Sequence, residues 1–529
     1  MKSTMVVLTI LVVALAERAT LAKDGDMNAR SVLVGDKEAG RAPPSLFIPV
    51  AAPRGEIPLR HSMNAVPAIP DVGVLQVSVP GDRILLNVSP ELTVKMLVTR
   101  VERHGEESVS VFGKLVGFVG SSVILVVQGD AVASEITAPQ AMLHYKTKYA
   151  SNGIHFVCKM DDDKYRPCGG GRTPATGVVH EEDWVPEAGE REGIDVRTAG
   201  FASRGTCANV GIVFDNMIVY TNVARAAAGG TSAIQAECQL AIDRTNESYE
   251  NSAINARIRL VRRYEINYDE KGTYNDHLDR ISGTNSMGGS TPWTTVRSDR
   301  DTFNADFCTL WVDDEEYCGL AWCIATSSAR GYQVVTWECA AGNLSHPHEI
   351  GHNQGCNHDH DNSGSECSAY DYSHGHRFYG SDTLQYRTVM AYSPGVRIPH
   401  FSNPAVSYLG TATGVPGAGS DAARNAETIE NRKAMCEGFE VTRWDIWVDF
   451  SHGGAEVGTF ALPYNTIAEG INNIDNWVAG ASEFPNLYIK EGSTNWTGTF
   501  NKVMSISSCG GSVTIGHRTM TLDPIGERK

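Results

Sequence analysis

The sequence is organised around residues 348–359, which read His348-Glu349-Ile350-Gly351-His352-Asn353-Gln354-Gly355-Cys356-Asn357-His358-Asp359. In a helix, residues four apart share a face, so His348 and His352 are placed to bind one metal ion together. Glu349 lies one step round the same turn. Gly355 permits the left-handed conformation that ends a helix, which lets His358 turn back toward the ion. Three imidazoles with one open position form a catalytic zinc site, so we predict Zn²⁺ bound by His348, His352 and His358.

Length and composition predict a multidomain extracellular protein. The chain has 529 residues, of which 42% are hydrophobic and 20% charged, and it is too long for one ordinary domain. A net charge of -17 argues against nucleic acid and anionic membrane surfaces as partners. The short apolar run from Met5 to Ala16 predicts a secretory signal peptide over residues 1–22, with a short membrane anchor as the weaker alternative. No later stretch is apolar enough to span a membrane, so we expect secretion.

The 12 cysteines suit an oxidising compartment, although sequence alone does not give their pairing. Four asparagines begin N-x-Ser/Thr triplets, which are glycan sites if the host is eukaryotic. They are Asn87, Asn246, Asn343 and Asn495.

Composition divides the chain before the His-rich stretch. Residues 23 to about 70 are rich in Pro, Gly, Arg and Ala, and predict a flexible leader. Residues 74–150 contain short alternating runs separated by glycines, which predict a small antiparallel β domain. Residues 158–204 have the composition of a linker, so we interpret residues 23–204 as a propeptide that is cut in this linker. The candidate cleavage points are Arg172, Arg191, Arg197 and Arg204.

Residues 205–440 alternate strands and helices. Strands are predicted at Val210 to Tyr220, Arg257 to Tyr268, Phe307 to Val312 and Tyr332 to Trp337. Helices are predicted after Thr231, at Tyr274 to Ile281 and from about Asp421 to Cys436. The alternation favours a mixed α/β layer with a mostly parallel sheet, with the His348 helix after its last strand.

Residues 445–529 differ from the preceding region. A helix is predicted at Ile467 to Val478, and short strands at Leu487 to Ile489, Val503 to Ile506 and Val513 to Ile515. Their spacing is similar to the opening rungs of a parallel β-helix. We expect either a carbohydrate-binding or matrix-binding accessory unit or a structural appendage.

The stretch 348–359, together with Met390 in Val389-Met390-Ala391-Tyr392, resembles the active site of the metzincin zinc endopeptidases. Asp359 after the third His makes it most similar to the reprolysin-like (adamalysin-type) branch. The resemblance covers roughly residues 205–440. It implies a twisted mixed sheet with helices above a lower irregular subdomain, with a cleft between them. The fold class is therefore predicted as multidomain α+β and α/β, with a β-rich N-terminal prodomain and a short C-terminal β-solenoid-like unit.

The resemblance also implies roles for residues. His348, His352 and His358 would be zinc ligands, Glu349 the general base, and Gly355 the turn. Met390 would form a hydrophobic floor. Tyr392 would either approach the metal or the oxyanion, or only pack beneath the cleft.

The implied reaction is hydrolysis of protein or peptide substrates by a zinc-activated water, without a covalent intermediate. The alternative is a catalytically silent adhesion or matrix-binding protein built on the same domain. That alternative requires loss of a ligand or of Glu349, and all are present.

Cysteines near the site leave alternatives open. Cys168 in Arg-Pro-Cys-Gly resembles the cysteine-switch segment of some metzincin propeptides, which would make the propeptide the enzyme's own inhibitor through a thiolate on zinc. The alternative is a disulfide between Cys158 and Cys168, which the even cysteine count favours. Cys356 is expected to form a disulfide that braces the turn, with an unknown partner.

Other polar residues surround the stretch. Because they lack the ligand spacing, His346, His360, His374 and His376 are expected to have supporting or surface roles. Calcium binding is undecided, since Asp359, Asp361 and Glu366 are acidic but follow no known loop spacing.

Overall fold

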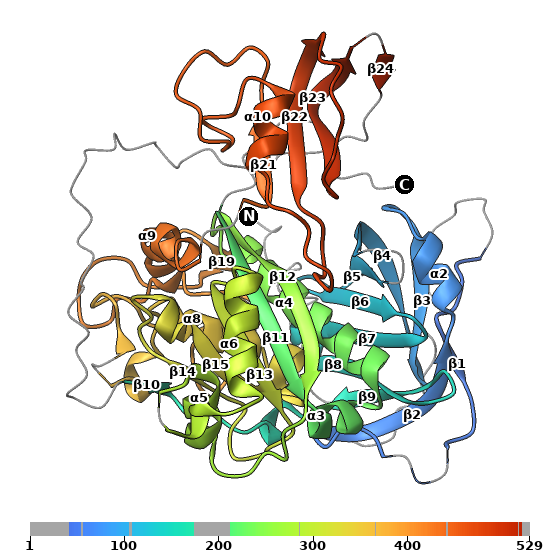
Figure 1. The fold of residues 1–529 in the computed structure, drawn as a ribbon. Helices are drawn as coiled ribbons and strands as arrows, with labels where there is room; N and C mark the ends of the chain where they lie inside the picture. The colour runs from blue at the N-terminus through green and yellow to red at the C-terminus, as the bar shows by residue number, and fades with distance from the viewer. Residues whose placement is uncertain are drawn as a thin grey trace, which may run out of the picture.

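The computed structural model describes residues 42–173, 212–440 and 443–520, apart from residues 54, 56, 105–107, 285, 365–366 and 517. The predicted signal peptide, the candidate cleavage points Arg191, Arg197 and Arg204, and Glu366 lie outside the described residues. Among the residues described, no helix is both long enough and apolar enough to cross a membrane. Figure 1 shows a β-rich N-terminal part in blue, a central α/β body, and a C-terminal unit in red.

The N-terminal part is one nine-stranded antiparallel sheet in the order β1-β2-β9-β8-β7-β6-β5-β4-β3. Its elements are β1 (Phe47–Pro49), β2 (Ser62–Pro70), α2 (Val72–Val77), β3 (Arg83–Ser89), β4 (Leu92–Arg103), β5 (Ser108–Leu115), β6 (Ser122–Gln128), β7 (Ala131–Ala138), β8 (Leu143–Ser151) and β9 (Ile154–Met160). The predicted β domain is therefore larger than expected. A flexible leader up to residue 70 was wrong for residues 47–49 and 62–70, because prolines in these strands obscure the period of two.

The central body contains a six-stranded sheet in the order β10-β14-β15-β13-β11-β12. Its strands are β10 (Gly171–Arg172), β11 (Ile212–Thr221), β12 (Ala256–Ile266), β13 (Phe307–Val312), β14 (Gly319–Trp322) and β15 (Tyr332–Thr336). Strands β12, β11, β13 and β15 run parallel, whereas β14 pairs antiparallel with β15. This confirms the predicted mostly parallel sheet. The short strand β14 was not predicted, and β10, which pairs with it, comes from the N-terminal part.

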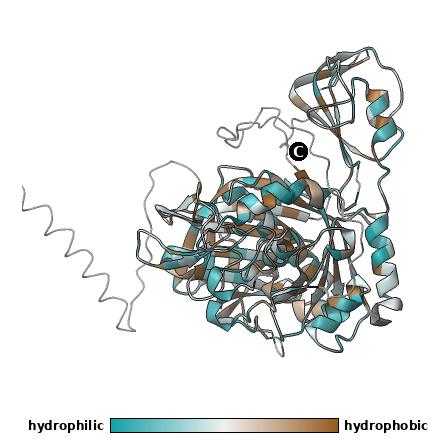
Figure 2. Ribbon diagram, turned by 90° about the vertical axis from the view of Figure 1, so that its left-hand side faces the viewer, coloured by the Kyte–Doolittle hydropathy of each residue, from teal (hydrophilic) through white to brown (hydrophobic). Residues whose placement is uncertain are grey.

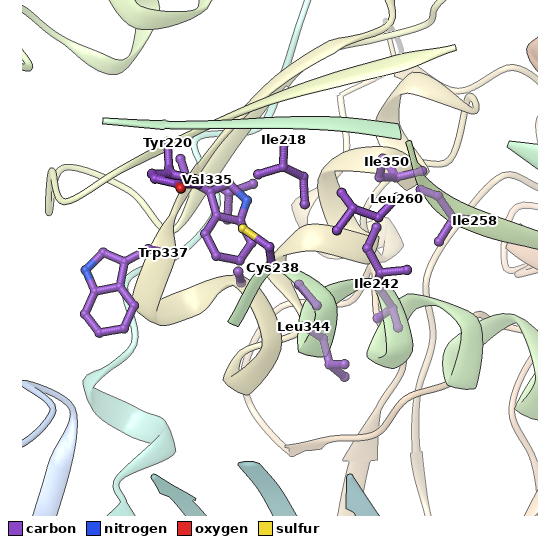
Figure 3. Close-up of a cluster of buried hydrophobic side chains, with 14 of the residues drawn as sticks. Ile218, Tyr220, Cys238, Ile242, Ile258, Leu260, Val335, Trp337, Leu344 and Ile350 are labelled. Carbon is purple, nitrogen blue, oxygen red and sulfur yellow. The ribbon is translucent and has the colours of Figure 1, made fainter. Parts of the chain in front are cut away.

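Helices pack against this sheet, and their buried side chains form the hydrophobic core together with those of the strands. They are α3 (Asn222–Ala228), α4 (Thr231–Asn251), α5 (Tyr274–Ser282), α6 (Trp293–Thr302), α7 (Trp337–Gly342), α8 (Ser345–Asn353) and α9 (Asn425–Glu437). Figure 3 shows Ile218 of β11, Leu260 of β12 and Val335 of β15 meeting Ile242 of α4 and Ile350 of α8. All five are fully or almost fully buried, so α4 and α8 are fixed by packing on the sheet.

Helix α4 also joins the central body to the N-terminal sheet. Ala236 and Leu240 of α4 pack against Phe112, Ile124 and Val126 of strands β5 and β6. Because α4 is covered by both sheets, most of its residues are buried, including acidic ones such as Glu237.

The region after α8 is mostly irregular, as predicted for the lower part. Before α9, the strands described in this region are short: β16 (Arg377–Tyr379), β17 (Gln385–Arg387), β18 (Val396–Arg397), β19 (Ser407–Tyr408) and β20 (Thr411–Ala412). Disulfides Cys318–Cys339 and Cys323–Cys367 brace β14 against α7 and against this region.

The C-terminal unit projects from the body (Figures 1 and 2), with β21 (Asp445–Val448), α10 (Ile467–Asn473), β22 (Asn486–Thr494), β23 (Ser505–Ile515) and β24 (Arg518–Met520). Strands β21, β22 and β23 are parallel. The two predicted strands after residue 500 are one strand, and α10 ends at Asn473 instead of Val478. The solenoid assignment stays a prediction. The unit is attached along β12, where Arg259 binds both Asp215 and Asp445.

Candidate metal centre

Helix α8 presents the first two histidines, and the turn after it presents the third. Pro347 lies in the first turn of α8, where its missing N–H costs no hydrogen bond. The helix ends at Asn353, and Gly355 follows with φ of 92°. A Cβ at Gly355 would also lie 2.6 Å from the side chain of Ala369, so the turn has no room for a larger residue. The chain then reverses and brings His358 back under the helix.

The three imidazoles converge through their Nε2 atoms. Nε2 of His358 lies 3.2 Å from Nε2 of His348 and 3.0 Å from Nε2 of His352. Each Nδ1 faces a backbone carbonyl: His348 donates to Val389, His352 to Cys356 and His358 to Asn362. Since a carbonyl only accepts, the proton sits on Nδ1 and every Nε2 carries a bare lone pair.

This donor set fits zinc. Burial lowers the pKa of all three imidazoles, which keeps them neutral and able to bind a metal. The His358 lone pair lies about 3 Å from each of the other two, and such lone pairs repel one another unless a cation lies between them. Nitrogen ligands about 2.0–2.1 Å from one tetrahedral zinc ion would be about 3.3 Å apart, close to the spacing found.

Glu349 lies beside the histidines in a space that Gly319 of β14 leaves open. A Cβ at Gly319 would come within 2.3 Å of Oε1 of Glu349. Both carboxylate oxygens are buried, and the thiol of Cys168 is their neighbour. Burial raises the pKa of Glu349 to about 8. A carboxylate beside an open metal position is placed to handle the proton of a water molecule.

Met390 and Tyr392 lie beneath and beside the cluster. Met390 is fully buried, and a Cβ added to Gly351 of α8 would lie 2.7 Å from its sulfur. The ring centroid of Tyr392 is 4.2 Å from that of His358. Its hydroxyl donates to the carbonyl oxygen of Cys168 at 2.8 Å. In this form the Tyr392 hydroxyl therefore binds the N-terminal segment.

That segment crosses the site along strand β14. The amide of Cys318 donates to Pro167, Gly169 donates to Gly319, and Cys323 donates to Arg172, at 3.1, 2.8 and 3.0 Å. Between these bonds, Cys168 directs its sulfur to within 3.8 Å of Nε2 of His352. The sulfur and the three Nε2 atoms are candidate ligand atoms within 4.8 Å of one another.

Two predicted disulfides are not formed. A disulfide between Cys158 and Cys168 was wrong, because both are free and Cys158 is buried in β9. A disulfide at Cys356 was also wrong. Cys356 is a free, buried thiol 3.6 Å from the carbonyl oxygen of Asn425, where it fills space beneath α9.

Asp359 has a bracing role that the spacing did not predict. Its carboxylate accepts from the amide of Tyr392 at 2.9 Å and from Arg377 at 2.8 Å. It also accepts from Asn362, whose carbonyl holds His358. Its position directly after the third histidine was the available signal.

The remaining histidines stand outside the convergent group. His360 donates to the carbonyl of Ala422, His374 lies 3.0 Å from the carbonyl of His358, and His346 is buried near Trp311. Asp361, considered for calcium, pairs with Arg377.

Comparisons with known proteins place this geometry in a family. Residues 213–402 match the Reprolysin_5 model of metallo-peptidase family M12. The peptidyl-Asp metalloendopeptidase of Stenotrophomonas maltophilia (strain K279a) is 30% identical over 325 residues, which are 60% of this chain and 71% of that protein. The peptidyl-Asp metalloendopeptidase of Xanthomonas campestris pv. campestris is 31% identical over 322 residues, 60% of this chain and 70% of that protein.

Among solved structures, metalloproteinase-II from Bacteroides fragilis aligns with 56% of this chain and 88% of its own, at 11% identity and a TM-score of 0.31. That score is too low to bear on the fold.

Proposed function

Since this chain belongs to metallopeptidase family M12 and is a metzincin-type zinc metalloendopeptidase, we propose that it is a secreted zymogen that cleaves proteins beside aspartyl residues. The main support for peptidase activity is that three unprotonated imidazole nitrogens converge beside a buried carboxylate. The preference for aspartyl residues is supported by the similarity to peptidyl-Asp metalloendopeptidases.

We assign the metal to His348, His352 and His358, each held by a carbonyl behind its ring. Zinc, when bound, supplies a Lewis acid and lowers the pKa of a water molecule. Glu349 takes the proton of the attacking water and returns it to the leaving amine. Met390 packs beneath α8 and keeps the ligand-bearing turn in place. Tyr392 becomes available to the substrate carbonyl when Cys168 leaves, since its hydroxyl is then released.

Latency is assigned to Cys168 and the propeptide. Residues 167–172 occupy the edge of β14, where an extended substrate would bind, and the Cys168 sulfur fills the position that water needs. A thiolate is a good zinc ligand, and a bound metal lowers its pKa. Removal of residues 23–204 would free both the sheet edge and the fourth ligand position.

Secretion is proposed from the N-terminal apolar run and from the disulfides Cys318–Cys339 and Cys323–Cys367. Of the four candidate glycan sites, Asn495 is exposed, whereas the Asn246 side chain bonds with Ile258 and Asn343 is buried. A glycan on the folded chain would therefore be expected at Asn495 before Asn246 or Asn343. For residues 445–529 we retain a carbohydrate or matrix contact as a proposal.

The test is the substitution Glu349→Gln, which removes the base and keeps its shape. We expect a folded, zinc-loaded protein whose kcat/KM on a denatured protein falls by roughly 100- to 10,000-fold after propeptide removal. Glu427→Gln, an exposed glutamate on α9 in the same body, is the matched control and should keep full activity. Wild-type protein should lose activity with a zinc chelator. Normal turnover by Glu349→Gln would overturn the proposed role.

A further inference from the structure

Two arginines lie side by side next to the metal centre. Strands β17 and β18 are parallel, and their register pairs Arg387 with Arg397. Both guanidinium groups donate to the same oxygen, the carbonyl of Ala391, at 2.9 Å from Arg387 and 3.1 Å from Arg397. Ala391 stands between Met390 and Tyr392, so the pair is held one residue from the floor of the site.

Neither arginine has a carboxylate partner among the described residues. The other donors also bind neutral carbonyls: Arg387 binds Gly395 at 2.8 Å, and Arg397 binds Asn343 at 2.6 Å. Nε of Arg397 is buried without a hydrogen-bond partner. The buried Arg259 is a contrast, because it binds the carboxylates of Asp215 and Asp445. Two adjacent cations without a counter-ion, one buried and one half-buried, are costly, which points to a ligand that supplies the negative charge.

Arg397 is the member of the pair that interacts electrostatically with the reacting groups. Arg397 lies within electrostatic range of Glu349 and His348, and it also influences Tyr392. Burial lowers the pKa of Arg397 to about 10, and burial together with Arg397 lowers the pKa of Arg387. An anion placed between them would reverse both effects.

The propeptide supplies only distant compensation. Asp162 attracts both arginines electrostatically, and Asp163 attracts Arg387, as does Asp359 of the body. However, the Asp162 carboxylate is hydrogen-bonded to His144 and bonds to neither arginine. Removing the propeptide would therefore leave the pair with less negative charge nearby and a stronger demand for an anion.

We propose that Arg387 and Arg397 form the subsite that binds the carboxylate of a substrate aspartate at the residue following the scissile bond. This inference rests on the proposed function and adds the residues that select the substrate. The planar guanidinium fork matches a carboxylate, and the uncommitted Nε of Arg397 is the donor that the ligand would engage.

The experiment uses the propeptide-processed enzyme and peptides that differ only at the residue after the cleaved bond. Asp is compared with its neutral isostere Asn and with Ala. We expect wild type to prefer Asp over Asn by on the order of 10- to 100-fold in kcat/KM, since charged hydrogen bonds in a buried site discriminate at this level. Arg397→Met and Arg387→Met should bring this ratio toward one.

Two controls keep the test decisive. Arg225→Met removes an arginine that is ion-paired with Glu265 far from the site and should leave the ratio unchanged. Arg397→Lys keeps the charge without the fork and should give an intermediate ratio. If the methionine variants fail to fold, inhibition of wild type by acetyl-aspartate amide, with weaker inhibition by acetyl-asparagine amide, supports the subsite, and equal inhibition overturns it.

The outcomes separate the two proposals. An active wild type whose Asp/Asn ratio is near one, or a ratio that survives in both methionine variants, would overturn the subsite alone. A folded, zinc-loaded wild type that cleaves none of the peptides and no denatured protein would overturn the proposed function together with the subsite.

Discussion

The sulfur of Cys168 lies 3.8 Å from Nε2 of His352, although 184 residues separate the two in the chain. The contact is made by backbone pairing, because residues 169–172 hydrogen-bond to strand β14 on one side of the site. The N-terminal sheet holds the segment from the other side, through β9. The Cys168 thiol is thus held at the metal centre by anchors on both sides, strand β14 and strand β9.

Substituting Cys168→Ser should weaken latency. A hydroxyl is a poorer zinc ligand than a thiolate, so the unprocessed variant should cleave peptide faster than the unprocessed wild type, by on the order of 10-fold or more. The check is peptide cleavage by full-length protein before and after processing, where the processed forms should be equal. Cys158→Ser, at the other free thiol of the N-terminal sheet, is the control.

Thiol labelling gives the same prediction a readout independent of activity. In zinc-loaded full-length wild type, Cys168 should react slowly with iodoacetamide, and a chelator should accelerate its labelling without unfolding the chain. A Cys168 thiol that labels equally with and without the metal would refute the latency contact.

Parts of this architecture could be predicted from sequence and parts could not. The helix bearing His348 and the strands at Phe307–Val312 and Tyr332–Thr336 carry strong local patterns, and their expected positions agree with the structure. The contact of Cys168 with His352 depends on strand pairing between distant segments, which no local period encodes. Likewise, Arg387 and Arg397 meet through strands of three and two residues, too short for any pattern.

His352 should be required for metal binding, independently of catalysis. Substituting His352→Gln removes one of three converging nitrogens, and we expect zinc affinity to fall by on the order of 100-fold or more, since even an outer-shell partner is worth about 10- to 100-fold. Zinc content after dialysis against a weak chelator measures this. His360→Gln is matched in chemistry, and its imidazole binds only the Ala422 carbonyl, so it should retain zinc. Full zinc occupancy in His352→Gln would contradict the ligand assignment.

The N-terminal sheet should lose stability at alkaline pH through His144. This imidazole lies between the carboxylates of Glu135 and Asp162, which raise its pKa to about 10 in the folded chain. A raised pKa means that the stabilisation is fully present below the unfolded pKa of about 6.5 and is lost as pH rises toward 10. A tenfold difference in proton affinity between the folded and unfolded chains is worth about 1.4 kcal/mol, so the loss should be large enough to measure.

The measurement is urea unfolding of full-length protein between pH 6 and 10. Wild type should lose more stability over this range than His144→Gln, which has no imidazole to deprotonate. Parallel pH profiles for the two proteins would rule out the assigned role of His144.

The interface between the two sheets should depend on a buried charge pair. Lys146 of β8 is fully buried, and its ammonium group donates to the carboxylate of Glu237 on α4 at 3.3 Å. Lys146→Met leaves Glu237 buried without its partner, so we expect a loss of roughly 3–5 kcal/mol and increased activity of the unprocessed chain as the N-terminal sheet detaches. Lys114→Met, at an exposed lysine of the same sheet, should change neither property.

Because apolar side chains of similar volume often replace a buried ion pair well, Lys146→Met combined with Glu237→Leu should recover most of the lost stability. A double variant no more stable than Lys146→Met would show that packing at this position, and not the unpaired Glu237 carboxylate, accounts for the loss.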